Sequence, residues 1–320
     1  MTTRIAVIGG GQNCEHEVSL ASAAGIADAL DASRYRAVRL TIDRDGRWHD
    51  EYGTQLGLAA AITVLQSCAA AIPALHGPRG EDGTVAALLD LAGVPYVGSG
   101  VRAGALAMDK HATKLLAGSV GVATAPGVLL TDPAAYRWTH PVVVKPVAAG
   151  SSQGVALVAT AAELAPALDA AFALDDRVLV EDVVLGREID LAVLARPDGA
   201  RVVAPALEIV VDGLFDAGTK YDGSADFRIP ASLAESELAA LESAAVAVFD
   251  ALGCRGVARV DFFWTTDGPV LNEVNTMPGF TAASQVPKMF AAAGVSYADL
   301  LDLLVTDARA ASSSVVPLPA

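Results

Sequence analysis

Short apolar runs alternate with segments of helical spacing along the first hundred residues. The apolar runs at 4–8, 36–42 and 69–75 predict strands, and the segments at 17–30 and 82–91 predict helices. Strands that alternate with helices are typical of a parallel sheet covered on both faces. We therefore expect residues 1–105 to form an α/β domain with a doubly wound parallel sheet.

The spacing changes in the next eighty residues, where strands outnumber helices. Helices are predicted at 108–120 and 163–174, and strands at 127–130, 141–146, 155–159 and 177–184. We expect residues 106–183 to form a small α+β unit.

The last part of the chain, residues 184–320, combines strands, an unpatterned stretch and helices. The pattern predicts strands at 188–195 and 201–209, a helix after the capping-box spacing of Ser232 and Glu235, a hairpin of 256–264 with 270–273, and two closing helices. Residues 212–228 are polar and contain glycine but show no period. Stretches of that length inside a domain are usually functional or mobile, so we expect a mobile loop there.

Composition excludes several classes of protein. Apolar residues make up 53% and charged residues 18%, which favours a globular chain over a disordered one. The net charge of −15 opposes non-specific nucleic-acid binding, which needs basic patches. The three cysteines form no CxxC pair, and their small number fits a reducing cytoplasm. The start has no signal-peptide pattern and the apolar runs break well before about 18 residues, so we expect no membrane insertion.

The strongest chemical signal is a pair of strands that carry oxygen ligands. Residues 259–261 read Arg-Val-Asp and residues 273–275 read Glu-Val-Asn, so the polar side chains of each strand project from one face. Adjacent strands would bring Asp261, Glu273 and Asn275 together. Two carboxylates and an amide suit Mg²⁺ that also binds substrate phosphates. The alternative is a pair of solvated, charged strand faces.

A second signal is Lys145, which ends the apolar run 142–144 and precedes the glycine/serine loop 149–154. A lysine at the tip of a buried strand is costly unless it meets an anion, and such a loop lets backbone N–H groups approach phosphate oxygens. The loop is not a Walker A motif. By itself it fits an ordinary hairpin turn equally well.

Glu15 and His76 follow two of the predicted strands of the first domain. Parallel α/β sheets bind ligands at the carboxyl edge of the strands, where Glu15 could hold a substrate ammonium. An acidic residue at a helix N-terminus is also stabilising as a cap, so capping remains the alternative. An isolated histidine such as His76 is more often structural than catalytic.

Taken in order, these segments resemble the D-alanine–D-alanine ligases, members of the ATP-grasp superfamily. The resemblance extends over almost the whole chain and rests on GGGQNCEHEVSL, ALHGPRGEDG, GSG, MDK, KPVAAGSSQGV, VEDVVLGREI, TKY, GCRGVARVD and NEVNTMPGFT. It implies an N-terminal α/β substrate domain followed by a two-part ATP-grasp module. The central subdomain would be 106–183 and the C-terminal catalytic subdomain 184–320.

The resemblance also implies binding residues for ATP and metal. The ATP-binding residues would be Lys110, Lys145, Ser151, Ser152, Glu181 with the backbone of Val183 and Val184, Glu188, Lys220, Asn272 and Glu273. Two Mg²⁺ ions, for which Mn²⁺ can substitute, would bind Asp261, Glu273 and Asn275. The family is commonly dimeric, which implies a homodimer.

For the substrates, the resemblance implies the following roles. Glu15 would bind the ammonium of the first D-alanine, oriented by Ser151 and Tyr221, with His76 nearby. Arg259 and the backbone at Gly279 would stabilise the tetrahedral intermediate, Ser284 would hold the second D-alanine, and Gln285 would lie beside it. In the implied reaction, the first carboxylate takes the γ-phosphate of ATP, and the second amine then displaces phosphate from the acyl phosphate. The 212–228 loop would exclude water from that intermediate.

Two positions bear on substrate specificity, and a third bears on nucleotide contact. Tyr221 is of the D-alanine–D-alanine type, whereas relatives that make D-alanyl-D-lactate lack it. Gln285 stands where many relatives carry an apolar or aromatic residue, so D-serine or a specialised D-amino acid stays open as second substrate. Asp182 stands where a lysine is common. A nucleotide-binding protein without ligase activity is the alternative from another class.

Overall fold

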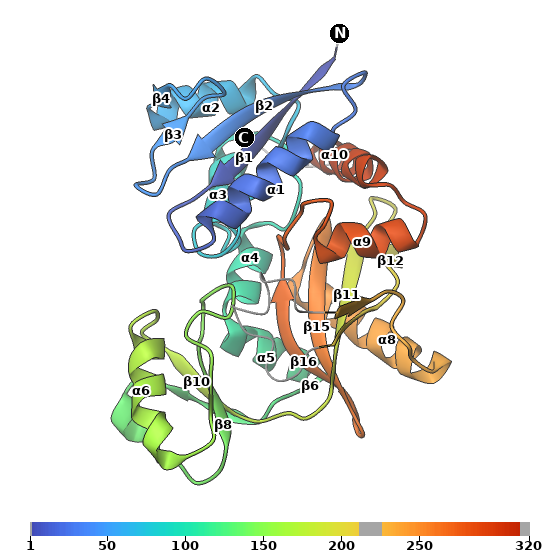
Figure 1. Cartoon of the computed structure of the whole chain (residues 1–320). Coiled ribbons are helices and arrows are strands. Elements are labelled where there is room, and N and C mark those ends of the chain that lie inside the picture. Colours follow the sequence, from blue (N-terminus) through green and yellow to red (C-terminus); the bar gives the residue numbers. More distant parts are fainter. Residues whose placement is uncertain (1, 211–225, 314–320) are drawn as a thin grey trace, which may run out of the picture.

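Three sheets, each with its own helices, carry the fold. The computed structural model describes residues 2–210 and 226–313 (Figure 1). In Figure 1 the small sheet under α6 lies apart from the large sheet that contains β11, β15 and β16, and the N-terminal sheet lies above both. The prediction of an α/β N-terminal part followed by α+β parts is confirmed.

The N-terminal sheet has the order β4-β3-β2-β1-β5. The strands are β1 (Thr3–Gly10), β2 (Tyr35–Ile42), β3 (Trp48–His49), β4 (Gln55–Leu56) and β5 (Ala70–Pro73), and the first, second and fifth are parallel. The helices are α1 (His16–Ala29), α2 (Leu58–Gln66) and α3 (Thr84–Ala92). The short antiparallel strands β3 and β4 at one edge were not predicted.

Alternation along β1 explains why helices cover both faces of this sheet. Ile5 and Val7 pack in one apolar cluster with Ile26 of α1. Ala6 and Ile8 point the other way, into the cluster that contains Leu65 of α2 and Leu89 of α3. The sheet is therefore doubly wound, as its apolar runs predict.

The central sheet is antiparallel and has one helical layer. Its order is β7-β10-β8-β9, formed by β7 (Gly127–Leu130), β10 (Val178–Asp182), β8 (Val142–Pro146) and β9 (Ala156–Val158), and it packs against α6 (Ala161–Phe172). Val142 and Val144 of β8 face α6 in a common cluster. The alternate residues Val143 and Lys145 line a cavity on the other face.

The large sheet has the order β14-β13-β11-β15-β16-β6, and β12 pairs with β11. Its strands are β6 (Ala123–Thr124), β11 (Arg187–Ala195), β12 (Arg201–Val203), β13 (Leu207–Val210), β14 (Asp226–Arg228), β15 (Val257–Thr265) and β16 (Gly268–Asn275). One face packs in a single cluster with α4 (Val101–Met108), α5 (Lys110–Ser119) and α8 (Glu235–Leu252). The other face packs in part against the C-terminal helices and otherwise borders the cavities described below.

The two C-terminal helices join the sheets. α9 (Gln285–Ala292) and α10 (Tyr297–Ser313) place Met289, Phe290 and Leu300 in the same cluster as Ile5 of β1 and Leu194 of β11. In Figure 1, α10 lies beside α1 under the N-terminal sheet, and α9 lies over the end of β11. Residues nearly 300 positions apart thus share one core.

Several predicted boundaries differ from the structure. The helix expected at 108–120 begins at Lys110, because the Asp109 carboxylate accepts a hydrogen bond from Ala112 N (2.9 Å) and caps α5. The capping box of Ser232 is wrong, since Ala234 precedes α8 and its N–H donates to Glu237. The strand expected at 201–209 is two strands, and β14 occupies the end of the stretch expected as a loop.

Among the described residues, no single helix is long and apolar enough to cross a bilayer. One pair of consecutive helices, Gln285–Ala292 and Tyr297–Ala311, is long and apolar enough together, by length and composition only, and is bent by 103° at the break between them.

Candidate active site

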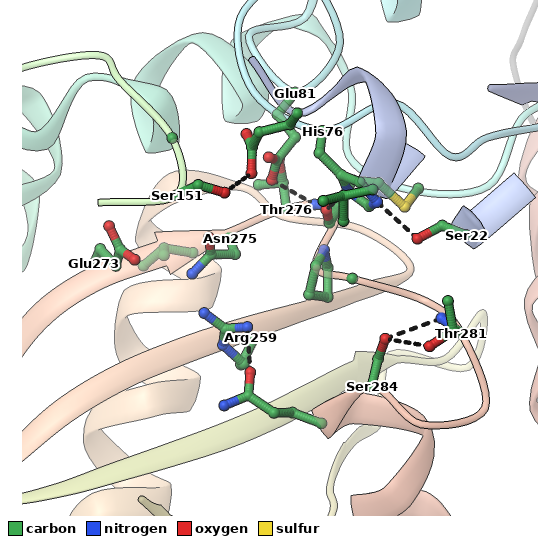
Figure 2. Close-up of a pocket in the computed structure, with 18 of the residues that line it drawn as sticks. Ser22, His76, Glu81, Ser151, Arg259, Glu273, Asn275, Thr276, Thr281 and Ser284 are labelled. Carbon is green, nitrogen blue, oxygen red and sulfur yellow. Dashed lines mark hydrogen bonds between the residues drawn. The ribbon is translucent and has the colours of Figure 1, made fainter. Parts of the chain in front are cut away.

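Two cavities meet in the space between the three sheets. The first, of about 600 Å³, is large enough for two small substrates. It is bordered by the loops after β1 and β5, by β15 and β16, and by the start of α9 (Figure 2). The second lies between the central and large sheets. Lys110, Ala149, Arg259 and Glu273 line both cavities, so ligands bound in the two would meet at these residues.

Glu15 and Ser151 bring the N-terminal and central regions together at the first cavity. Ser151 Oγ donates to Glu15 Oε1 at 2.5 Å. Glu15 precedes α1 and its side chain makes no capping hydrogen bond, while stabilisation of the helix N-terminus by its charge stays a prediction. A Cβ on Gly150 would lie 2.1 Å from Glu15 Oε2, so a side chain at this position would displace Glu15 or the loop. Glu15 is thereby presented as an acceptor for a cationic group.

His76 is buried and held in one tautomer. Its Nδ1 donates to the carbonyl oxygen of Met277 (2.7 Å). Because Nδ1 carries the proton of the neutral ring, Nε2 accepts from Ser22 Oγ (2.9 Å), which itself accepts from Phe280 N (3.2 Å). Burial lowers the pKa of His76 despite the charge of Glu15. His76 is therefore a neutral residue that joins α1, the loop after β5 and the loop after β16.

Glu81 belongs to the same site and was not predicted. Its carboxylate accepts from Gly77 N (2.9 Å) and from Met277 N (2.8 Å), so it fixes two loops against each other. Burial, and then the negative charge of Glu15, raise the pKa of Glu81 to about 8. Figure 2 shows Glu81 beside His76, at the upper end of the cavity. The sequence gives no sign that this acid is buried.

A β-bulge places the polar residues of β15 and β16 on one face. Asp261 lies opposite Glu273 and Arg259 lies opposite Asn275, but Phe262 lies opposite Leu271. Asn272 is therefore the extra residue. Strict alternation would put Leu271 on the same face as Glu273, whereas the bulge returns Leu271 to the core. Figure 2 shows Glu273, Asn275 and Arg259 projecting into the cavity together.

Arg259 is the cation of this face. Its Nε and Nη2 donate to the two oxygens of Asp261, each at 2.7 Å, and Asn275 Nδ2 also donates to Asp261 (3.0 Å). Burial lowers the pKa of Arg259, but the charges of Asp261 and Asp190 outweigh burial and raise it above its ordinary value. Arg259 is a permanent positive charge between both cavities.

The start of α9 forms the far wall of the first cavity. Ser284 Oγ lies 3.0 Å from Thr281 N and 2.9 Å from Thr281 Oγ1, which fixes the turn before the helix (Figure 2). A Cβ on Gly279 would lie 3.3 Å from the Ser284 hydroxyl. Gln285 lines the cavity, but its amide binds Arg259 and Asp190.

The second cavity has a cationic side and a carboxylate. Lys145 Nζ lies 2.6 Å from Glu181 Oε2, and Lys114 pairs with the other oxygen of Glu181. Lys110 Nζ lies 3.3 Å from Glu273 Oε2 and donates to the carbonyl oxygen of Ala149 (3.1 Å). Lys114 was not predicted; burial lowers its pKa, against the charge of Glu181. Two of the lysines expected for the phosphates of ATP thus line this cavity.

The structure brings together every predicted site residue that it describes. The first cavity is lined by Glu15, His76, Lys110, Ser151, Arg259, Glu273, Asn275, Gly279, Ser284 and Gln285. The second is lined by Lys110, Lys145, Ser152, Glu181, Val183, Val184, Glu188, Arg259, Asp261, Asn272 and Glu273. Lys220 and Tyr221, with most of the loop expected at 212–228, lie outside the described residues.

Metal binding can be judged from the available ligands. Asp261 and Glu273 are direct cross-strand neighbours with Asn275 next to them, and all face the cavities. Within residues 2–210 and 226–313, no three Asp, Glu, His or Cys side chains form a metal-binding group, so a metal here would need the amide of Asn275. Since Asn275 donates its nitrogen to Asp261, its oxygen is the atom left to bind a cation. This open, oxygen-only set fits a hard cation shared with phosphate.

Comparisons with known proteins agree along the chain. Residues 4–67 and 54–99 match the family described as D-ala D-ala ligase N-terminus, and residues 131–306 match D-ala D-ala ligase C-terminus. The chain is 40% identical to D-alanine--D-alanine ligase of Mycolicibacterium smegmatis, covering 96% of both chains. It is 41% identical to the enzyme of that name from Rhodococcus erythropolis, covering 96% of this chain and 97% of the relative.

Solved structures with the same fold include three ligases. D-alanyl-alanine synthetase A from Vibrio cholerae superposes with a TM-score of 0.84 at 28% identity, covering 97% of this chain and 99% of the other. The D-Ala:D-Ser ligase VanG from Enterococcus faecalis superposes with a TM-score of 0.83 at 32% identity, covering 96% of this chain and 100% of the other. A Bacillus anthracis D-alanine--D-alanine ligase complexed with ATP superposes with a TM-score of 0.81 at 29% identity, covering 98% of this chain and 99% of the other.

Proposed function

The chain belongs to the D-alanine–D-alanine ligase family, and from this membership we infer how its residues join two D-alanines at the expense of ATP. The products are D-alanyl-D-alanine, ADP and phosphate, and the dipeptide serves peptidoglycan synthesis. One observation carries the assignment of roles. A cavity with a carboxylate for an amino acid opens onto a cavity with lysines for a nucleotide, and Lys110, Arg259 and Glu273 belong to both.

We assign the second cavity to ATP. Lys145 and Lys110 would bind phosphate oxygens, helped by Ser152 and the backbone of its loop, and their pairing with Glu181 and Glu273 holds them in place before the nucleotide arrives. Glu181 and the backbone of Val183 and Val184 would bind the adenine. Glu188 would bind the ribose. Lys220, outside the described residues, would reach the γ-phosphate.

We propose that two Mg²⁺ ions, for which Mn²⁺ can substitute, bind to Asp261, Glu273 and Asn275. Asn272 would lie beside them. The metal would neutralise phosphate charge during transfer. In the chain itself, Arg259 already compensates the charge of Asp261. Glu273 pairs with Lys110 at 3.3 Å.

We assign the first cavity to the two D-alanines. Glu15 would bind the ammonium of the first, and Ser151 would orient it, with Tyr221 outside the described residues. The carboxylate oxygen of this D-alanine attacks the γ-phosphorus, ADP leaves, and an acyl phosphate forms. Ser284 would bind the carboxylate of the second D-alanine.

The second chemical step forms the amide bond. The neutral amine of the second D-alanine attacks the carbonyl carbon of the acyl phosphate, and a tetrahedral oxyanion forms. Arg259 and the backbone at Gly279 would stabilise that negative charge, since Arg259 stays protonated throughout. Phosphate then leaves. His76 would act by holding the cavity walls in place, because both of its ring nitrogens are bonded to the protein.

A ligase with a different second substrate is the competing function. One observation favours it: the fold matches a D-Ala:D-Ser ligase at 32% identity. A nucleotide-binding protein without ligase activity is the other alternative. We further propose a cytoplasmic location, where ATP is available, and a homodimer.

The test is a phosphate-release assay with ATP, with and without Mg²⁺, followed by identification of products by mass. D-alanine alone, D-alanine with D-serine, and D-alanine with D-lactate are supplied in parallel. We expect Mg²⁺-dependent release with D-alanine alone and a product of two D-alanines. Release that needs D-serine or D-lactate would support the competing function. No release in any mixture would contradict ligase activity.

A further inference from the structure

Gln285 was expected beside the second substrate, but its amide is engaged by the protein at both ends. Gln285 Oε1 accepts from Arg259 Nη1 at 2.5 Å, and Gln285 Nε2 donates to Asp190 Oδ2 at 2.9 Å. The reverse orientation would set the amide nitrogen against guanidinium N–H groups and the amide oxygen against a carboxylate. The partners therefore determine the orientation of the amide.

Asp190, which accepts from Gln285, is a buried carboxylate beside Asp261. It lies on β11 directly opposite Asp261 of β15, and only 1% of its surface is exposed. Two carboxylates side by side compete for the same cation, and Arg259 Nε lies 3.5 Å from Asp190 Oδ2 but 2.7 Å from Asp261 Oδ1. The guanidinium therefore stands between a closer and a more distant acid.

Gln285 contacts both Arg259 and the more distant of the two acids, Asp190. By donating to Asp190, its amide supplies part of the polar contact that this buried carboxylate requires. By accepting from Nη1, it ties the guanidinium to α9, while Asp261 binds the other two nitrogens. Without the amide, Asp190 would draw Arg259 toward itself.

We propose that Gln285 and Asp190 form a clamp that positions Arg259 for the reaction, and that Gln285 does not select the second substrate. The proposal rests on the proposed function for the role of Arg259. It also predicts dependence between the two positions: an apolar residue at 285 is tolerated only when position 190 carries no charge. The clamp acts through Arg259, so Gln285 is a positioning residue.

The main test compares Gln285→Met, Asp190→Asn and the double variant with the parent enzyme. Methionine keeps the length and unbranched shape of glutamine but makes no amide hydrogen bonds. We expect Q285M to lower kcat about 10- to 100-fold, because Arg259 is misplaced by a fraction of an ångström, with KM for ATP and D-alanine within about threefold. Removing the competing charge in D190N/Q285M should restore kcat to within about threefold of D190N alone.

Substrate preference provides the second readout. Ser284→Ala is the neighbouring control, since it alters a residue assigned to the second substrate; it should raise KM for that substrate. Q285M should leave the ratio of D-serine to D-alanine use unchanged. A changed ratio, or a double variant no better than Q285M, would overturn the clamp.

Thermal unfolding separates the clamp from the function. Q285M should lower Tm by leaving Asp190 short of a donor, and D190N/Q285M should recover that loss, whether or not the protein is a ligase. If Q285M does not fold, folding of the double variant supports the clamp and its failure contradicts the clamp. If the Tm change of the double variant equals the sum of the changes in the two single variants, the clamp is also contradicted. If the double variant recovers its Tm but the parent enzyme has no ligase activity, only the proposed function is rejected.

Discussion

Single residues in this site differ in how far the sequence could reveal them. Glu15, His76 and Arg259 stand in local motifs next to strand ends, and their neighbours in the chain indicate their environment. Asp190 follows the apolar Ile189 in an alternating strand, which looks like a solvent-facing position. Its partner Gln285 is 95 residues away, so only the fold shows that Asp190 is buried. Burial and distant pairing are the properties that local spacing does not encode.

Glu81 offers a prediction at this scale. Its pKa is raised from 4.5 to about 8 by burial and then by Glu15. Between about pH 4.5 and 8 the folded state therefore binds more protons than the unfolded chain, so stability from this group is complete below pH 4.5 and is lost as pH rises to about 8.

Glu81→Gln should remove this pH dependence. The variant should be less stable than the parent at pH 5, because an amide nitrogen cannot accept the N–H of Gly77 or Met277. Its Tm should then change less between pH 5 and 8. Calorimetry of both proteins across that range measures the two slopes, and equal slopes would contradict a raised pKa.

Elements were predicted well where one face is apolar over several turns or residues, as in α1, β2 and β15. The elements and boundaries that were predicted wrongly are those that depend on only a few residues. β3 and β4 have two residues each, too few for a period to register. The division between β12 and β13, and the start of α5 at Asp109, depend on contacts with other elements. Such boundaries are tertiary properties of the chain.

The glycine/serine loop between β8 and β9 offers a prediction at the scale of elements. It is a hairpin connection and also lines both cavities, while its contact with phosphate stays a prediction. Gly150→Ala should displace Glu15 or the loop, because the added Cβ would lie 2.1 Å from the carboxylate. We expect KM for D-alanine to rise about tenfold, as for a displaced positioning group.

Saturation kinetics with D-alanine and ATP measure this effect. Gly118→Ala is the control, since its Cβ would meet nothing within 4 Å and Gly118 lies in the last turn of α5, where alanine is a better helix former than glycine. It should leave both KM values unchanged. An unaltered KM for D-alanine in G150A would show that the loop approaches Glu15 less closely.

One apolar cluster joins β1, near the start of the chain, to α10, near its end. β1 and α10 share it with β11 and α9, so the walls of the first cavity are fixed by packing between distant segments. The apolar pattern predicts each helix and strand, but not that α10 returns to the first sheet, because its apolar face could pack on several surfaces. The central sheet has a cluster of its own.

Leu300→Ala tests this organisation. Leu300 is fully buried in the joining cluster, so the change should cost about 3 kcal/mol. The chain has three tryptophans, and variants that keep only one report on separate regions. Trp48 reports on the N-terminal sheet, Trp264 on the large sheet and Trp138 on the central sheet.

We expect L300A to lower the urea midpoint seen by Trp48 and by Trp264 equally, and to affect the Trp138 signal less. Fluorescence of the three single-tryptophan proteins, with and without L300A, gives these midpoints. A shift confined to Trp48 would show that the cluster does not couple the two sheets.

The bulge at Asn272 has a consequence for how the length of this chain can change. Loss of Asn272 alone would leave Leu271 opposite Phe262 and Glu273 opposite Asp261, now as a regular ladder. Loss of Val274 would instead break the pairing of Asn275 with Arg259. Position 272 is therefore the place in these paired strands where a one-residue deletion keeps Glu273 opposite Asp261 and Asn275 opposite Arg259, although it removes the side chain of Asn272 from the second cavity.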